Sequence, residues 1–471
     1  MLDTLFILPI SFWIVVILLF IGIIWALGRL RGGTGLPCLA VLVTVAAWYV
    51  GDVLYNDYAG YHVEQFAFKV LDDAWWQVAL FLGTFLLLIP FVHRYLNSKQ
   101  IGQPSLVLRL WRAGIGDEEF QQQLVRLFYS CVAVWGILAG IAALRLGGET
   151  QYYFFPFLGY KAEPWGRGRV GGEFDALLSF AGYFQLFVAG AFGVMAALIK
   201  DRRVMWYALA GCTLTWPYYF FDRSRNQIIA IALPAVLTWV FLRLRGNFLK
   251  KILVLAACFL LLESWMAFVL VNRTSSSIAT AFSEKGFSLE GNAGRKHEGL
   301  NMYEELCWIN TFLEDGTYEP NWGQRYFAEL VNPVPRGLWA AKPFIGIDYA
   351  IVRGSALSNE QDAGVTTTIS TGMIGQGIVN FGRFFGPPFA ALLMAIWVAI
   401  LARLDLTGQK IGRIPLYAFG IILTFNLGRD VTFITLYSFV FGRMLIWSME
   451  QVVERRRRKN ILLVNQPLTT Q

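Results

Sequence analysis

Long apolar runs separated by short polar gaps dominate the pattern along this chain. Most are long enough to cross roughly 30 Å of hydrocarbon as a helix. We count eleven, with the seventh and tenth the shortest, at 5–27, 37–54, 75–92, 127–144, 176–199, 204–221, 227–242, 252–271, 384–402, 414–428 and 431–449. The runs are solidly apolar instead of alternating, so they are not the strands of a closed barrel. Because a backbone in lipid must satisfy its own hydrogen bonds, the pattern predicts an all-α polytopic membrane protein with 10–12 transmembrane helices.

Composition supports this fold class. Of the 471 residues, 56% are hydrophobic and only 15% are charged, whereas soluble domains carry about 25% charged residues. The first run follows the leader Met1–Thr4, which has no positive charge, so we expect a retained helix and not a cleaved signal peptide. The formal net charge of +8 then reflects membrane topology, and we expect no nucleic acid partner.

Basic residues gather in alternate gaps between the runs. They concentrate at 94–126, 200–203, 243–251, 403–413 and 455–459, whereas the other short gaps hold few. Cytoplasmic loops carry the excess of lysine and arginine, so the N-terminus is predicted outside and the C-terminus inside. The basic tail, 451–471, is expected in the cytoplasm against anionic headgroups.

Several chemistries have no sequence signature here. The chain contains no Gly-x-x-x-x-Gly-Lys-Ser/Thr run, and its histidines and cysteines do not have metal-ligand spacing. The largest cytoplasmic gap, 94–126, contains no Asp-x-Asp pair of the kind that nucleotide-sugar enzymes use. We therefore expect no cofactor and no metal, and a substrate that arrives from the membrane or from outside.

The predicted organisation places the chemistry in one outer loop. Residues 1–271 hold helices one to eight, 272–383 form a long loop, and 384–450 hold the last three helices. A loop of this length is uncommon unless it is functional or disordered, and its many aromatic residues favour a folded segment. Within it, the stripe Met302, Leu306, Ile309 and Leu313 predicts an amphipathic helix that directs Glu304 and Glu305 away from its apolar face.

Arginines mark the outer face at several points. In the loop, Pro333 and Pro335 predict an extended backbone that presents Arg336 beside an aromatic ring, and Arg353 follows. Further guanidiniums at outer helix ends are Arg223, Arg225 and Arg429. Each alone is best explained as an interfacial ion pair, but together they suggest a polyanionic ligand, because the guanidinium fork matches phosphate oxygens. The glycine-rich run 372–382 allows close approach of a ligand or of a neighbouring helix.

Two short patterns resemble a known family. Pro335-Arg336-x-Leu338-Trp339-x-x-Lys342-Pro343, followed by Gly375 to Gly382 ending in Asn-Phe-Gly, is similar to the Wzy-type O-antigen and exopolysaccharide polymerases. Arg353 and Gly364 also fit the Arg-x10-Gly spacing of that family. One departure is Gln376, at a place where we expect an acidic residue. Since an amide is not a base, any general base must lie elsewhere.

The resemblance implies a GT-C-like helical bundle in the bacterial inner membrane, with its long loop in the periplasm. There a growing glycan would leave one undecaprenyl pyrophosphate and join a repeat unit on another. The implied substrate is an undecaprenyl-pyrophosphate-linked oligosaccharide among membrane lipids, with a flippase and a chain-length regulator as candidate partners.

We predict roles for ten side chains from this chemistry. A departing pyrophosphate needs preorganised cations, and an acceptor hydroxyl is helped by a carboxylate. The catalytic candidates are Arg336, Arg353, Glu304, Glu305 and Asp348, and the substrate-binding candidates are Arg223, Arg225, Arg429, Lys342 and Trp339.

Three alternatives stay open. A ligase that moves finished glycan onto an acceptor needs the same cations and aromatic residues. A transporter or lipid flippase is less favoured, because the charged residues concentrate at outer ends and not at mid-membrane, where transport pathways place them. A scaffold for polysaccharide export does not require the arginines.

Overall fold

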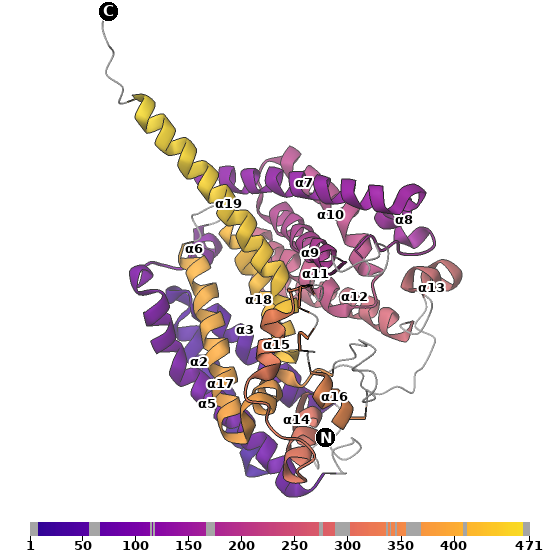
Figure 1. Ribbon diagram of the computed structural model, residues 1–471. Coiled ribbons are helices and arrows are strands. Elements are labelled where there is room, and N and C mark those ends of the chain that lie inside the picture. The colour runs from indigo at the N-terminus through magenta and orange to yellow at the C-terminus, as the bar shows by residue number, and fades with distance from the viewer. Residues whose placement is uncertain are drawn as a thin grey trace, which may run out of the picture.

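The structure is a computed structural model. It describes residues 8–55, 66–113, 115, 118–165, 175–272, 277–287, 302–335, 338–339, 341–343, 346–354, 369–407 and 412–464. Throughout these ranges the regular structure is helical, and no strand occurs in them (Figure 1). The all-α prediction is therefore confirmed for the described part of the chain.

Seven helical segments within these residues are long and apolar enough to cross a membrane. They contain α2 (Ile10–Gly28), α5 (Phe68–Leu96), α7 (Glu118–Leu146), α9 (Asp175–Leu198), α11 (Arg225–Thr238), α12 (Phe248–Val271) and α17 (Gly372–Leu406). Each coincides with one of the predicted spans. The chain is therefore a multi-pass membrane protein by the length and composition of its helices.

The other four predicted spans are also helical, but they fall short in length or in hydropathy. They correspond to α3 (Gly35–Val45) with the π-helical turn Ala46–Gly51, α10 (Arg202–Phe220), α18 (Arg413–Arg429) and α19 (Phe433–Val464). Shorter helices fill the gaps: α4 (Asp52–Tyr55), α6 (Leu106–Ala113) and α8 (Thr150–Phe154). Length and composition therefore identify seven candidate crossings among the described residues.

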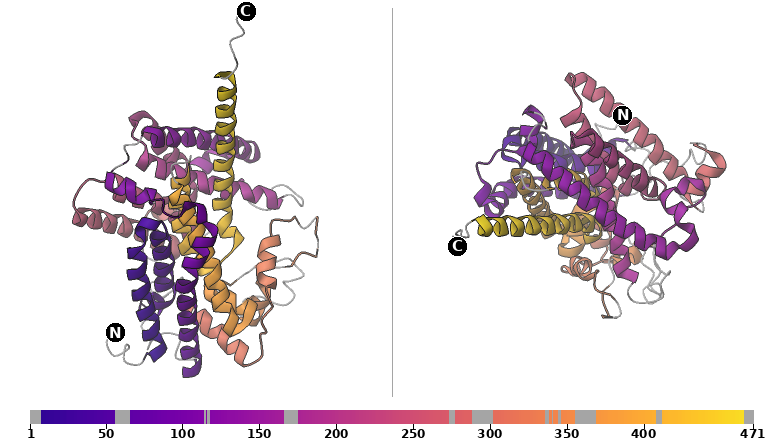
Figure 2. Two further views of the ribbon diagram at one scale, coloured as in Figure 1. Left: turned by 90° about the vertical axis from the view of Figure 1, so that its left-hand side faces the viewer. Right: turned by 90° about the horizontal axis from the view of Figure 1, so that it is seen from above.

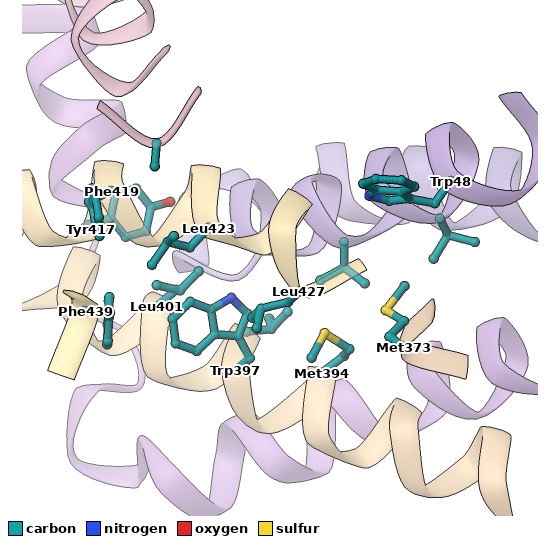
Figure 3. Close-up of a cluster of buried hydrophobic side chains, with 14 of the residues drawn as sticks. Trp48, Met373, Met394, Trp397, Leu401, Tyr417, Phe419, Leu423, Leu427 and Phe439 are labelled. Carbon is teal, nitrogen blue, oxygen red and sulfur yellow. The ribbon is translucent and has the colours of Figure 1, made fainter. Parts of the chain in front are cut away.

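The helices form two groups that cross. In the left view of Figure 2 the N-terminal helices α2, α3 and α5 stand side by side, and α7 runs across their direction at the top. Helix α9 packs against α7, α10 and α11, while α17 packs along α5 and against α18. Figure 3 shows the buried layer between α17 and α18, where Trp397 and Leu401 face Leu423 and Phe419. The fold thus brings α17, which begins at the long loop, and α18, which ends near it, into the core.

The long loop predicted at 272–383 contains short helices in its described part. These are α13 (Ile278–Lys285), α14 (Met302–Glu314), α15 (Gln324–Val331) and α16 (Ile347–Val352). Figure 1 shows α14, α15 and α16 gathered beside the lower part of α17, while α13 lies apart near α12. Pro333 and Pro335 predict an extended backbone after α15. In the structure the N–H of Val334 instead donates to the carbonyl of Val331, 3.0 Å away, and closes a turn.

Helix α17 is in fact a helical hairpin. Its backbone leaves helical geometry at Gly382 (φ 77°, ψ 177°), where a residue without Cβ adopts the left-handed region at little cost. Beyond this point the chain folds back, so that a Cβ built on Gly377 would lie 2.3 Å from the carbonyl oxygen of Gly386. Helical structure thus begins at Gly372, before the predicted loop end at 383, and at Gly377 the close approach is made by a neighbouring backbone and not by a ligand.

Candidate functional site

Helix α14 is fixed to the N-terminal part of α5 by buried polar contacts. The side-chain amides of Gln77 and Asn310 exchange two hydrogen bonds of 2.7 and 2.9 Å, and both residues are buried. The Tyr303 hydroxyl donates to the carbonyl of Leu71 at 3.0 Å, and its ring stacks on Trp75 with centroids 4.3 Å apart. Satisfied polar groups of this kind specify one arrangement, since leaving either partner unpaired is costly. The loop helix is therefore a rigid platform.

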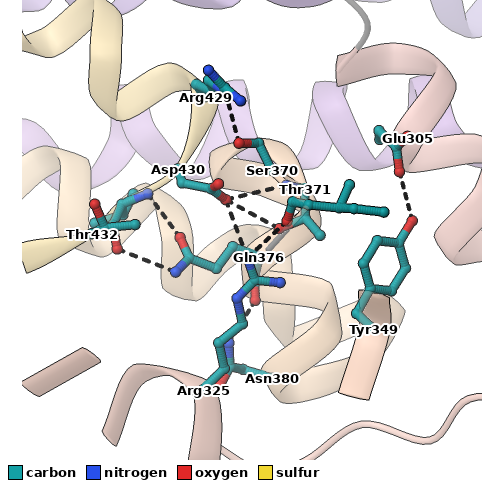
Figure 4. A network of polar contacts seen from close by, with 12 residues as sticks. Glu305, Arg325, Tyr349, Ser370, Thr371, Gln376, Asn380, Arg429, Asp430 and Thr432 are labelled. Atoms are coloured by element: carbon teal, nitrogen blue, oxygen red, sulfur yellow. Dashed lines mark hydrogen bonds and ion pairs between the residues drawn. The ribbon is translucent and has the colours of Figure 1, made fainter. Parts of the chain in front are cut away.

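This platform carries a buried carboxylate. The sequence predicts that Glu305 lies away from the apolar face of α14, but only 3% of this residue is exposed. The reason is that Glu305, three residues after Met302 and four before Ile309, flanks the apolar stripe, and the Tyr349 hydroxyl of α16 donates to its Oε2 at 2.8 Å (Figure 4). Glu305 is consequently enclosed on two sides by loop helices.

Arg353 completes what we call the Glu305 cluster, formed by Glu304, Glu305, Trp308, Tyr349 and Arg353. Its Nη2 lies 3.4 Å from Oε1 of Glu305 and 3.8 Å from Oε1 of Glu304. The guanidinium carbon also lies 4.3 Å from the centroid of the Trp308 ring, a cation–π contact. Nε of Arg353 has no hydrogen-bond partner among the described residues. Two carboxylates therefore face one guanidinium.

Burial controls the protonation of this cluster. Desolvation raises the pKa of Glu305 above its usual value, and the charge of Arg353 together with the hydrogen bond from Tyr349 opposes the increase. Burial, reinforced by the charge of Glu305, also raises the pKa of Tyr349 well above its ordinary value. Tyr349 therefore stays a hydrogen-bond donor, while the raised pKa of Glu305 means that it holds a proton more tightly than an exposed carboxylate does.

A second group of polar residues surrounds the start of α17. We call Arg325, Ser370, Thr371, Arg429 and Asp430 the Arg325 cluster (Figure 4). The backbone N–H and the hydroxyl of Thr371 donate to Oδ1 of Asp430 at 3.2 and 3.3 Å. Nε of Arg429 donates to the Ser370 hydroxyl at 2.7 Å. The loop end, the first turn of α17 and the C-terminus of α18 are thereby joined.

Arg325 is the most deeply buried member, with 2% of its side chain exposed. Its Nη2 lies 3.5 Å from Oδ1 of Asp430 and donates to the carbonyl of Ile369 at 3.3 Å. Gly346, which has a left-handed φ of 61°, brings its backbone against the guanidinium, so that a Cβ there would lie 3.1 Å from Cζ. The sequence does not single out Arg325, because it lies inside a short helix instead of in a motif.

Gln376 and Asn380, which lie within the Gly375 to Gly382 pattern, support the backbone around this cluster. The side chain of Gln376 accepts from the N–H of Val431 at 2.8 Å and donates to its carbonyl at 3.2 Å. Oδ1 of Asn380 accepts from the N–H of Tyr326, 3.3 Å away. Both residues are buried. Gln376 and Asn380 thus hold the strand-like link after α18 and the first turn of α15 against the hairpin.

Asp348 lies in α16 directly before Tyr349 of the Glu305 cluster. Its Oδ2 accepts hydrogen bonds from the Tyr318 hydroxyl at 2.7 Å and from Nδ2 of Asn321 at 3.3 Å. The Tyr318 ring meets the Tyr349 ring edge to face, 6.0 Å between centroids, and Tyr349 belongs to the Glu305 cluster. The structure therefore brings Glu304, Glu305, Asp348, Arg353 and Arg429 into one region of the molecule.

Lys342 and Trp339, which were predicted to bind substrate, contact other parts of the protein in the structure. Nζ of Lys342 donates to the carbonyls of Asn332 and Val334 at 2.8 and 2.9 Å, and the residue is buried. Lys342 therefore fixes the turn after α15. Trp339 is half-exposed and its ring contacts Phe327, with centroids 6.3 Å apart.

Arg223 and Arg225 lie in a different neighbourhood, at the junction of α10 and α11. The preceding Phe221 packs on Trp265 of α12 and Phe282 of α13, and α13 lies away from α16 (Figure 1). Arg336 and Gly364 fall outside the described residues. Within the described ranges, no group of three or more His, Cys, Asp or Glu side chains could hold a metal ion.

No protein-family model, curated protein or solved structure matches this chain.

Proposed function

We propose that this protein polymerises undecaprenyl-pyrophosphate-linked oligosaccharide repeat units into an O-antigen or exopolysaccharide. The proposal places eleven transmembrane helices in a bacterial inner membrane, with the N-terminus and the loop helices in the periplasm and the C-terminus in the cytoplasm. The observation that carries it is the pairing of buried Glu305 with Arg353 on a rigid loop platform. A glycosyl transfer onto a hydroxyl needs this combination of proton acceptor and cation.

The proposed step is a substitution at the anomeric carbon of the donor sugar. A hydroxyl oxygen of the acceptor repeat unit bonds to that carbon, and the bond from the carbon to the pyrophosphate oxygen breaks. The electron pair leaves with undecaprenyl pyrophosphate, and the hydroxyl proton passes to a carboxylate. Atoms and charge balance without a cofactor.

Glu305 is assigned as the general base and Arg353 as a cation for the leaving group. The raised pKa of Glu305 makes its ionised form a stronger base than an ordinary carboxylate. Nε of Arg353, which has no acceptor among the described residues, is left to donate to a phosphate oxygen. Arg336 and Arg429 are further candidates for phosphate contacts, since a doubly charged leaving group needs several cations.

The test is a gel profile of surface and secreted polysaccharide from the native bacterium, with the gene deleted and then restored. The restored variants are Glu305→Gln and Arg353→Gln, and the matched control is Glu314→Gln, which removes an exposed carboxylate from the same helix. We expect the control to produce long chains and both variants to leave single repeat units, with equal protein in the membrane. Long chains in both variants would contradict the assignment.

The same experiment separates the alternatives. A ligase predicts that polymer accumulates on the lipid carrier and fails to reach its acceptor. A flippase predicts that lipid-linked single units remain on the cytoplasmic side. An unchanged profile on gene deletion excludes all three roles in polysaccharide assembly.

A further inference from the structure

Helix α12 is the least buried of the seven candidate membrane spans. Its most apolar stretch is only 11% buried, against 72% for the corresponding stretch of α9. It packs against α11 and the turn Trp239–Arg243, and near its C-terminal end Phe268 and Val269 join a buried cluster with Phe221 and Ile278. In the right view of Figure 2 this helix lies at the edge of the molecule. Much of α12 therefore faces away from the rest of the described chain.

One exposed face of α12 has the spacing of a helix-pairing seam. Its residues are separated by three and four positions in turn and are all exposed; they are Leu249, Ile252, Ala256, Phe259 and Glu263, which we call the α12 stripe. Alternating steps of three and four average about 3.5 residues, which is the repeat of two helices that pack along each other. The stripe thus has the pattern of a helix that lies against another helix.

Glu263 sets this face apart from an ordinary lipid-facing surface. It lies twelve residues after Lys251 and nine before Asn272, which is about 18 and 14 Å along the helix axis at 1.5 Å per residue. These two distances together match the hydrocarbon thickness of about 30 Å, so Glu263 lies near its middle when α12 crosses the membrane. Lipid covers leucine and phenylalanine well, but an ionisable side chain at this depth is costly and almost always pairs with another polar group.

A second copy of the chain supplies such a group. Two copies enter a membrane in the same direction, so a twofold axis along the membrane normal places identical residues at the same depth. The α12 stripe then meets itself, with Glu263 opposite Glu263 and Ala256 opposite Ala256. A protonated carboxyl group both donates and accepts a hydrogen bond, so two of them are self-complementary, and the small Ala256 side chains let the two backbones approach closely.

We infer that this protein forms a parallel homodimer through the α12 stripe, in which the two Glu263 carboxyl groups hydrogen-bond to each other. The single polar position in an otherwise apolar seam fixes the register of the two helices. The dimer does not rest on the proposed polymerase function.

The test is cysteine cross-linking of the full-length protein in its native membrane. Cys258, the cysteine that lies within α12, is first replaced by alanine, and the other four cysteines are buried. A short thiol cross-linker is then applied to Ala256→Cys, which lies in the stripe, and to Ala257→Cys as the matched control. Both alanines are exposed, but Ala257 points about 100° away around the helix. We expect a product of twice the chain mass from Ala256→Cys and little or none from Ala257→Cys.

Two further variants, made in the Ala256→Cys protein, test the role of the carboxyl group. Glu263→Leu removes the hydrogen bond and keeps the face apolar, so the protein should insert normally and associate about tenfold more weakly. Glu263→Gln keeps a donor and an acceptor in the same position, so it should cross-link as the native side chain does. Apolar packing alone would predict the opposite order of the two variants.

Three results would overturn the inference. The first is an equal yield, or no product, at both alanine positions. The second is a product of Ala256→Cys whose mass is not twice that of the chain, which would assign the stripe to a different membrane protein. The third is a Glu263→Leu protein that cross-links as well as the native side chain. Because the readout is the mass of the cross-linked product, either this inference or the proposed function can fail alone.

Discussion

The two arginine clusters near the long loop differ in their balance of charge. In the Glu305 cluster two carboxylates share one guanidinium, with Arg353 24% exposed. In the Arg325 cluster two guanidiniums share one carboxylate, and the Arg325 side chain is 2% exposed. Arg429 is exposed, and buried Glu329 lies four residues after Arg325 in α15, so the buried part of the Arg325 cluster has no excess of positive charge. The Glu305 cluster, with two carboxylates for one guanidinium, favours a bound proton.

The largest expected effect is on the α17 hairpin, which supports the Arg325 cluster. Gly377→Ala inserts a Cβ 2.3 Å from the Gly386 carbonyl oxygen, so the hairpin that carries the Arg325 cluster must open. We expect a loss of about 3 kcal/mol, measured as a lower Tm in detergent. Gly136→Ala, where no atom lies within 4 Å, should stabilise α7 by about 0.5–1 kcal/mol. Equal Tm values for the two variants would contradict the hairpin packing.

The next effect tests the charge balance directly. Arg353→Met leaves Glu304 and Glu305 without a guanidinium, and we expect a loss of about 1–2 kcal/mol, reduced by partial exposure. Adding Glu304→Gln should restore most of it. Arg325→Met leaves the largely buried Asp430 without its guanidinium but also removes two unpartnered donors, and we expect a loss of about 1–3 kcal/mol. The charge-balance argument fails if Glu304→Gln does not restore stability to the Arg353→Met protein.

A smaller effect concerns pH. The pKa of Glu305 is raised on folding, so the folded state binds the proton more tightly than the unfolded state. Its contribution is fully present below the unfolded pKa, near 4.5, and is lost as pH rises through the folded pKa. We expect Tm to fall across that window by the equivalent of at most about 1.4 kcal/mol per unit of pKa shift. Glu305→Gln should remove this part of the pH dependence; an unaltered profile would assign it to another group.

The smallest effect is a control on burial. Lys69 and Glu314 form an ion pair of 2.6 Å on the same platform, but both side chains are exposed. Replacing both by alanine should leave Tm and polysaccharide length unchanged, because exposed pairs contribute little. A clear loss of Tm or of polysaccharide length in the double variant would show that an exposed ion pair matters as much as the buried pair of Glu305 and Arg353. Burial would then not distinguish the Glu305 cluster.

Hydropathy and periodicity predict much of this fold. All eleven apolar runs are helical, and the stripe from Met302 to Leu313 forms α14. The spacing of Glu305 from Met302 and Ile309 places it beside the stripe, so the prediction that it lies away from the apolar face was wrong. Its partners Tyr349 and Arg353 could not be predicted from the stripe, since α16 begins 33 residues after α14 ends. Periodicity describes one helix and says nothing of a second helix that packs on it.

The candidate site is predicted less completely. Arg353 and Arg429 were predicted from cations on the face expected to lie outside, and both belong to the two clusters. Lys342 was predicted to bind substrate, but its ammonium group donates to two backbone carbonyls and closes a turn. Arg325 is absent from the sequence prediction because its importance lies in burial, which depends on Gly346, Ile369 and Asp430 from three distant segments. Such a site is a property of tertiary contacts and leaves no local pattern.

Helix α19 has a mechanical consequence. Its 32 residues span about 48 Å at 1.5 Å per residue, whereas a hydrocarbon layer is about 30 Å thick. Figure 1 shows this helix leaving the rest of the molecule toward the C-terminus. If one end lies at the membrane surface, the last turns stand clear of the lipid as a stiff rod. Because α19 packs against α18, a displacement of this helix is transmitted to α18 and, through Asp430, to the first turn of α17.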